Sequence, residues 1–256
     1  MKILLVNEAG CFAQGVIALA KALSVRHRVV IVGPLDPQDG AGHHLTTSAY
    51  PLRVRQYFVL NKVKIYSVNG TPCDCVTLAL DKILKSKPDL IVAGIDNHRN
   101  RGETIYSSGV VSAAIEGTIQ GIPSIAVSAK VHDAENEKNF YAVAENFAKN
   151  LNYFVSNMTP DTTLNINYPE KFSAKKIVCT HLTTGLINNK YSSEVNPFGM
   201  TFYWLNAPVM GFSSAALEQN GDLRWLKKGY ITVTPLKLNL TNNEAIEIVK
   251  NAGIEA

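Results

Sequence analysis

The sequence has few cysteines and no long apolar run, and both absences limit what the chain can be. No apolar segment approaches the roughly 18–20 residues of a membrane-spanning helix, so we expect no membrane partner. Cys73 and Cys75 are one residue apart, which is not a zinc spacing, and no second pair of cysteines completes it. The first apolar residues are not followed by a small-residue cleavage site, so we predict a cytoplasmic protein with reduced thiols.

Charge of either sign is not concentrated in one part of the 256 residues. Lys and Arg outnumber Asp and Glu by 25 to 21, and the densest basic stretches are only Lys175–Lys176 and Arg99–Arg101. This mild excess suits a small anionic ligand better than a nucleic acid. The sequence also lacks a Gly-x-Gly-x-x-Gly spacing after its first strand, which argues against a dinucleotide-dependent oxidoreductase or a sugar transferase on a similar core.

The first half of the chain alternates apolar strands with amphipathic helices. The strand over 88–95 is apolar from Leu90 onward, as expected of a central parallel strand. Thr71, Pro72 and Asp74 suit the N-cap and first turn of a helix. Such an alternation is typical of an α/β protein. The predicted strands are 1–7, 27–32, 52–60, 64–68, 88–95 and 124–128, and the predicted helices are 15–24, 71–84, 108–121 and 135–151.

The second half of the chain has a different character. Residues 186–206 contain turn residues and several aromatic side chains, which suggests a protruding hairpin that docks on another subunit. A capping box starts a terminal helix over about 242–252. No linker separates the halves, so we predict a single domain with a core over 1–155 and a C-terminal part over 156–256. Strands are also predicted over 162–168, 176–182 and 230–236.

Acidic residues follow strands at positions where α/β sheets bind ligands. Glu8 comes directly after the first strand, and Asp39 and Asp96 fall at the same kind of position later in the chain. Ligands of open α/β sheets lie outside the carboxyl ends of the strands. Three carboxylates at neighbouring strand ends therefore predict a cation site or a crevice that handles phosphate.

A series of motifs in the same order resembles the SurE family of stationary-phase survival proteins, and the resemblance covers nearly the whole chain. It implies a three-layer, mostly parallel α/β fold with a Rossmann-like core, followed by an extended C-terminal arm that exchanges between subunits in dimers or tetramers. It also implies a metal-dependent phosphatase that acts on nucleoside monophosphates. The motifs are Asn7-Glu8-Ala9-Gly10, Gly70-Thr71-Pro72-Cys73-Asp74-Cys75-Val76, Ala93-Gly94-Ile95-Asp96, Asn100-x-Gly102, Ser108-Gly109-Val110-Val111, Leu164-Asn165-Ile166-Asn167-Tyr168-Pro169 and Gly229-Tyr230-Ile231-Thr232-Val233-Thr234-Pro235.

The positions that resemble the family's metal ligands are substituted in this chain. The family uses two adjacent Asp, a Ser and an Asn, and the matching positions here are Glu8, Ala9, Asp39 and Asp96. Ala9 has lost a ligand outright, whereas Glu8, Asp39 and Asp96 still allow an oxygen site for Mg²⁺ or Mn²⁺, with Ca²⁺ as a further candidate. The alternative is an ion-pair network without metal, in which His98 and the arginines at 99 and 101 neutralise Asp96.

The resemblance also implies a phosphate site at the start of the helix that follows residue 107. The backbone N–H groups of Ser108 and Gly109 suit a phosphate oxygen, although Ser108 also suits a simple N-cap. The family has Thr where this chain has Val110, so one hydroxyl donor is gone. The other residues predicted to bind the substrate phosphate are Ser107, Asn100 and Arg99.

Glu8, Asn7 and His43 are the predicted catalytic residues. His43 follows Gly42 in a long loop, as a His does in the family, and suits a proton donor or a phosphate ligand. The expected function is hydrolysis of nucleoside monophosphates to nucleoside and phosphate, that is, a 5'- or 3'-nucleotidase. The alternative is a catalytically impaired relative that binds nucleotide or phosphate, or serves as an oligomeric scaffold. Tyr106 suits a base pocket or simple packing.

Overall fold

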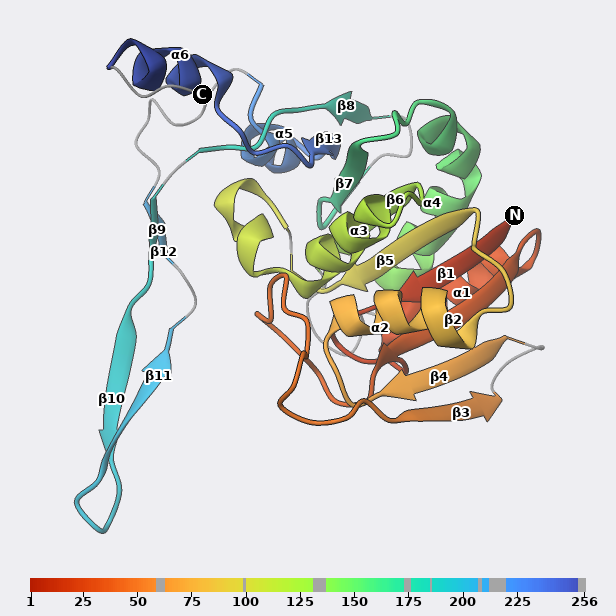
Figure 1. Ribbon diagram of the computed structural model, residues 1–256, viewed down its shortest axis with the longest axis horizontal. Helices are drawn as coiled ribbons and strands as arrows, with labels where there is room; N and C mark the ends of the chain where they lie inside the picture. Colours follow the sequence, from red (N-terminus) through yellow and green to blue (C-terminus); the bar gives the residue numbers. More distant parts are fainter. Residues whose placement is uncertain are drawn as a thin grey trace.

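The computed structural model describes residues 1–58, 63–98, 100–130, 137–172, 176–184, 186–206, 209–211 and 220–252. Their largest element is one sheet with the strand order β3-β4-β2-β1-β5-β6-β7-β13-β8 (Figure 1). Its strands are β1 (Lys2–Val6), β2 (Arg28–Pro34), β3 (Val54–Phe58), β4 (Lys64–Val68), β5 (Leu90–Asp96), β6 (Ser124–Ala129), β7 (Thr162–Tyr168), β8 (Ile177–Cys179) and β13 (Ile231–Lys237). The α-helices are α1 (Gln14–Ser24), α2 (Pro72–Leu78), α3 (Gly109–Ile119), α4 (Glu137–Ser156), α5 (Asp222–Lys227) and α6 (Asn243–Asn251).

The six adjacent strands β4, β2, β1, β5, β6 and β7 are parallel to one another. At the two ends of this set, β3 runs antiparallel to β4, and β13 runs antiparallel to β7. The chain passes from β1 to β2 on one side and later returns to β5 on the other side of β1. This reversal is the switch point at which doubly wound sheets bind ligands. The predicted Rossmann-like α/β fold is confirmed, and β1 and β5 lie on either side of this switch point.

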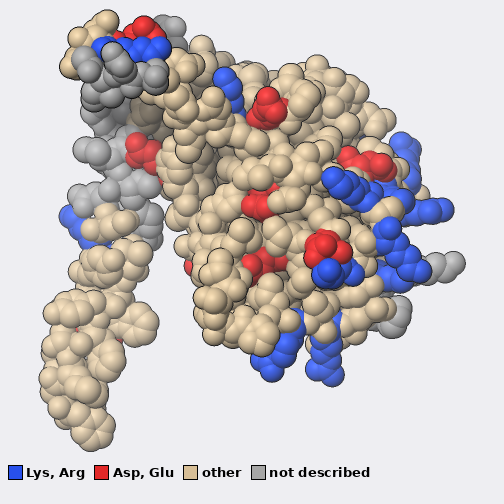
Figure 2. All heavy atoms as spheres, in the orientation of Figure 1, with Lys and Arg blue, Asp and Glu red and all other residues tan. Residues whose placement is uncertain are grey.

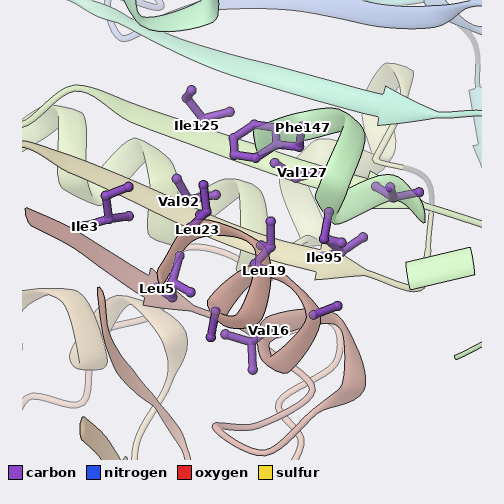
Figure 3. Close-up of a cluster of buried hydrophobic side chains, with 14 of the residues drawn as sticks. Ile3, Leu5, Val16, Leu19, Leu23, Val92, Ile95, Ile125, Val127 and Phe147 are labelled. Carbon is purple, nitrogen blue, oxygen red and sulfur yellow. The ribbon is translucent and has the colours of Figure 1, made fainter. Parts of the chain in front are cut away.

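Each face of the sheet is covered by helices, which makes three layers. The strand β1 shows how: Ile3 and Leu5 pack with α1 and α4, and Leu4 and Val6 pack with α2 and α3. Figure 3 shows the first of these layers, where Leu19 of α1 and Phe147 of α4 meet the sheet. Full burial of one such side chain contributes about 1.5–3 kcal/mol. A strand buried on both faces is mostly apolar, as β5 is from Leu90 to Ile95, before it ends at Asp96.

The start of α2 follows the predicted capping pattern. Thr71 accepts a hydrogen bond from the N–H of Asp74, and the Asp74 carboxylate accepts one from the N–H of Thr71. Pro72 occupies the first helical position. The helix predicted to extend to Leu84 is α-helical only to Leu78 and continues as a π-helical segment, η1 (Ala79–Ile83).

The hairpin predicted over 186–206 projects from the body of the molecule as an arm (Figure 1). It comprises β9 (Leu186–Asn188), β10 (Tyr191–Val195), β11 (Thr201–Leu205) and β12 (Val209–Gly211), in two antiparallel pairs. On the face seen in Figure 2 the arm carries almost only uncharged side chains. Its exposed apolar residues are Tyr191, Val195, Phe198, Met200, Phe202, Tyr203, Trp204 and Leu205. Among the described residues, no helix combines the length and the apolar character needed to cross a membrane.

Candidate functional site

Glu8 and Asp96 meet at the carboxyl ends of β1 and β5. The register pairs Val6 of β1 with Ala93 of β5, so both acidic residues leave the sheet at the same edge. Their carboxyl groups lie within hydrogen-bonding reach of one another. Glu8 is 4% exposed and Asp96 is 2% exposed. The two residues that the sequence placed at separate strand ends therefore form one buried acidic pair.

The acidic pair is electrostatically unfavourable when both groups are charged. Burial, and next the negative charge of Asp96, raise the pKa of Glu8 to about 9, and Asp39 adds to the shift from an exposed position nearby. Two buried carboxyl groups in contact require a proton or a positive partner. The acidic pair thus favours the binding of a positively charged group.

The carboxylate of Asp96 is held by the segment that follows it. Its Oδ1 accepts a hydrogen bond from the backbone N–H of His98 at 2.9 Å, and its Oδ2 accepts one from the Asn100 side chain at 2.8 Å. The His98 ring approaches Oδ1 to 3.5 Å, and this hydrogen bond raises the pKa of His98. One contact of the ion-pair alternative is therefore present, while Arg99 lies outside the described residues.

Helix α3 begins directly against Glu8. The backbone N–H of Gly109 donates to Oε2 of Glu8 at 2.6 Å, and the hydroxyl of Ser108 caps the helix by accepting from the N–H of Val111. The helix start predicted to bind a phosphate oxygen is thus bound to a carboxylate of the chain itself. The positive end of a helix stabilises a negative group at this position. Ser107 lies exposed just before it, with its hydroxyl donating to the Thr104 carbonyl.

Asn100 is fixed by side chains from β6 and β7. Its carbonyl oxygen accepts hydrogen bonds from Asn165 at 2.7 Å and Asn167 at 2.8 Å, and its N–H donates to Ser128. The Ser128 hydroxyl in turn donates to Asn167. These contacts leave the Asn100 side chain to bind Asp96. No role was predicted for Asn165 and Asn167, although polar residues alternating along an otherwise apolar strand were a visible signal.

Asn7 joins the ends of β1 and β5. Its side-chain N–H donates to the Ile95 carbonyl at 3.1 Å, and its side-chain oxygen accepts from the N–H of Ala9 at 3.0 Å. Ala9 itself is exposed and offers only a methyl group. The Asn7 amide is thus used to shape the turn that presents Glu8, and a direct catalytic role for Asn7 stays a prediction.

The long loop after β2 is anchored at both sides of His43. On one side, the N–H of Gly42 donates to the Ser107 carbonyl at 3.2 Å. On the other side, the N–H and hydroxyl of Thr46 donate to the two carboxylate oxygens of Asp74, at 2.8 and 2.7 Å. Asp74 therefore holds this loop as well as capping α2. The same loop carries Asp39 to the rim of the crevice.

His43 contacts a residue for which no role was predicted. Its Nε2 lies 2.8 Å from Oε2 of Glu116 on α3. His43 also lines a cavity of about 1060 Å³ beside η2 (Gly102–Ser107), together with Tyr106 and the apolar side chains Ile105 and Ile115. The cavity is large enough for a nucleoside and opens next to the loop that carries the predicted catalytic histidine.

Replacing Gly109 with Ala is expected to disturb the acidic pair. A Cβ atom at this position would lie 2.8 Å from Oε2 of Glu8 and 2.9 Å from Cγ of Pro72. Such a clash costs about 1–3 kcal/mol, whereas Gly to Ala in an unhindered helix stabilises by roughly 0.5–1 kcal/mol. Urea unfolding of the Gly109→Ala variant should therefore show a net loss of stability. An unchanged or increased free energy of unfolding would contradict the close approach of Glu8 to α3.

The chemistry of these donors fits a hard divalent cation. Glu8 and Asp96 supply buried carboxylate oxygens, and Asp39 is close enough to act on Glu8. In the part of the chain that the structure describes, no group of three or more His, Cys, Asp or Glu side chains is arranged to hold an ion. Mg²⁺ commonly takes only one or two protein carboxylates and completes its shell with water and substrate phosphate. Two carboxylates are thus compatible with a cation of this class.

Comparison with known proteins shows the family of the chain. A family model for the survival protein SurE matches residues 3–192. The chain belongs to the SurE family. Its curated relatives include a protein named 5'-nucleotidase SurE from Geotalea daltonii, which is 37% identical over 258 residues covering 98% of both chains. Another protein of that name, from Pseudothermotoga lettingae, is 34% identical over 96% of this chain and 92% of its own.

A solved structure of the SurE family has the same fold. The crystal structure of a SurE protein from Aquifex aeolicus matches with a TM-score of 0.81 and 35% identity, over 99% of this chain and all of its own. The family assignment and the α/β fold predicted from the ordered motifs are therefore confirmed. The roles predicted for Glu8, Asp39, Asp96 and His43 remain predictions.

Proposed function

We propose that this chain is a phosphomonoesterase of the 5'-nucleotidase type, which hydrolyses a nucleoside monophosphate to nucleoside and phosphate with a divalent cation. The buried contact between Glu8 and Asp96, beside the start of α3 at the switch point of the sheet, carries the proposal. The activity in the names of the relatives supports it. Mg²⁺ or Mn²⁺ is the proposed ion, because the donors are carboxylate oxygens.

Glu8 and Asp96 would hold the cation, with Asp39 at the exposed rim. When bound, the cation supplies a Lewis acid for the phosphoryl oxygens and lowers the pKa of a coordinated water. The start of helix α3 holds the Glu8 carboxylate through the N–H of Gly109, and the positive end of the helix stabilises the negative charge of that carboxylate. Asn100 keeps the Asp96 carboxylate in place through its amide. His43, at the edge of the cavity lined by Tyr106, would exchange a proton with the nucleoside oxygen.

Phosphate release with and without divalent ions tests this function. We expect turnover of nucleoside 5'-monophosphates with Mg²⁺ or Mn²⁺, and a loss of at least about a hundredfold after treatment with EDTA that the ion reverses. The same assay with 3'-monophosphates measures the preference between the two ester positions. No turnover with either ion, together with nucleotide binding in calorimetry, would show that the chain binds nucleotide without hydrolysing it.

We also propose that the arm joins two or more copies of the chain in the cytoplasm. The exposed aromatic side chains of β10 and β11 form an uncharged surface of the kind that subunit contacts bury. All four cysteines are free thiols, three of them buried, as is usual in a reducing compartment.

A further inference from the structure

Glu116 lies beneath the imidazole ring of His43, and the chemistry above gives it no role. Oε2 of Glu116 is 2.8 Å from Nε2 of His43, and Oε1 accepts a hydrogen bond from the Gln120 side chain at 2.9 Å. The Glu116 side chain is 5% exposed, whereas the His43 side chain is 35% exposed. The carboxylate is thus buried with both oxygens engaged, and the ring above it remains open on the side of the cavity.

The contact fixes which ring nitrogen carries a hydrogen. The hydrogen bond from His43 holds the pKa of Glu116 below its ordinary value, although burial acts in the opposite direction. Of the other groups near Glu116, Gln120 is uncharged and Cys73 on α2 is neutral, because burial raises the pKa of its thiol to about 12. Glu116 is therefore an acceptor, and Nε2 must donate. Nδ1 is then the nitrogen available for proton exchange.

The backbone on both sides of His43 restricts where the ring can lie. Gly42 has φ +58°, and a Cβ atom there would lie 2.9 Å from the Tyr106 carbonyl oxygen, so the loop is pressed against η2. The carbonyl of His44 accepts a hydrogen bond from the Thr71 hydroxyl. The titratable groups that share the lining of the cavity with His43 are Tyr106, Cys179, His181 and Lys237. His43 is thus held by its neighbours in sequence and by Glu116.

We propose that Glu116 is a positioning residue for hydrolysis: by binding Nε2, it holds the His43 ring so that Nδ1 gives a proton to the departing nucleoside oxygen. This inference rests on the proposed nucleotidase function. In the step, the bond between phosphorus and the nucleoside oxygen breaks, and a water oxygen forms a new bond to phosphorus. The nucleoside oxygen takes the proton from Nδ1. A proton of the attacking water returns the ring to its starting state, so that water and ester become alcohol and phosphate.

The variant Glu116→Gln tests the role, since it keeps the shape of the side chain and removes its charge. We expect kcat to fall roughly tenfold to a hundredfold, part of what a positioned general acid contributes, while KM changes little. The pH dependence of kcat should also change, because the substitution removes the negative charge next to the ring. Glu145→Gln, an exposed substitution on α4, is the matched control and should leave both the rate and the profile unchanged.

A second variant keeps the test decisive if Glu116→Gln proves unstable. His43→Gln replaces the partly exposed partner, and we expect it to lower kcat at least as much. The double variant should then be no slower than His43→Gln, because Glu116 acts only through the ring. Wild-type kcat and pH profile in Glu116→Gln, or losses that multiply in the double variant, would overturn the inference. An inactive wild-type protein would instead overturn the proposed nucleotidase function.

Discussion

Replacing Asp96 with Ala is expected to lower kcat/KM for phosphate release by about a thousandfold, roughly 4 kcal/mol of transition-state stabilisation. Asp96 is 2% exposed and meets Glu8 where β1 and β5 end. The substitution removes one of the two buried carboxylates that would hold the cation. It also frees the Asn100 amide, which now donates to Asp96 at 2.8 Å. Initial rates at saturating Mg²⁺ or Mn²⁺ measure the loss.

The stability of the Asp96→Ala variant separates a lost site from a lost fold. Removing Asp96 relieves its like-charge contact with Glu8 but leaves the buried Asn100 amide without its acceptor, so we expect these opposing effects to keep the melting temperature within a few degrees of wild type. Asp81→Ala is the matched control, because Asp81 is 70% exposed and pairs only with Lys82 in a solvent-exposed ion pair. A folded Asp96→Ala protein that retains phosphate release within tenfold of wild type would refute the placement of the site between β1 and β5.

Most of the fold could be predicted from the sequence because its local signals agree with its tertiary packing. The β5 segment is apolar up to Asp96 and lies between two parallel neighbours, and the Thr71–Asp74 pattern caps a helix as expected. Prediction was weaker beyond residue 176. There, β8 is only Ile177–Cys179, although a strand was predicted over 176–182, and α5 (Asp222–Lys227) lies outside every predicted helix. Short elements carry too few residues for a hydrophobic period to emerge.

The candidate site was predicted in its residues more than in its contacts. Glu8 and Asp96 are at strand ends, and parallel topology alone brings strand ends together. Contacts between a loop and a helix leave no such trace in a sequence, so the pairing of His43 with Glu116, 73 residues apart, was not foreseen. The same holds for the clamp that Asn165 and Asn167 form on the Asn100 carbonyl. In the sequence, each of these residues is an ordinary polar residue, and only the folded structure shows its partner.

Asp222 joins the C-terminal part of the chain to Gly102, which lies close to the site residue Asn100. Replacing Asp222 with Ala is expected to cost about 3–5 kcal/mol of folding free energy. The residue is fully buried at the start of α5. Its carboxylate accepts hydrogen bonds from the N–H of Gly102, from the N–H and hydroxyl of Thr183, and from the N–H of Leu223. Without it, these buried donors lose an acceptor. Urea unfolding measures the loss.

Comparing the stabilities of two Asp222 variants distinguishes the loss of hydrogen-bond acceptors from the creation of a cavity. Asp222→Asn keeps one carbonyl oxygen, so it should lose about half as much stability as Asp222→Ala. Asp161→Ala, in an exposed turn before β7, is the control and should stay within about 0.5 kcal/mol of wild type. Gly102 lies two residues after Asn100, so its release should also reduce phosphate release by the Asp222→Ala protein that remains folded. If the Asn and Ala variants were both as stable as wild type, the carboxylate contacts would contribute little, and α5 would be held by its apolar packing alone.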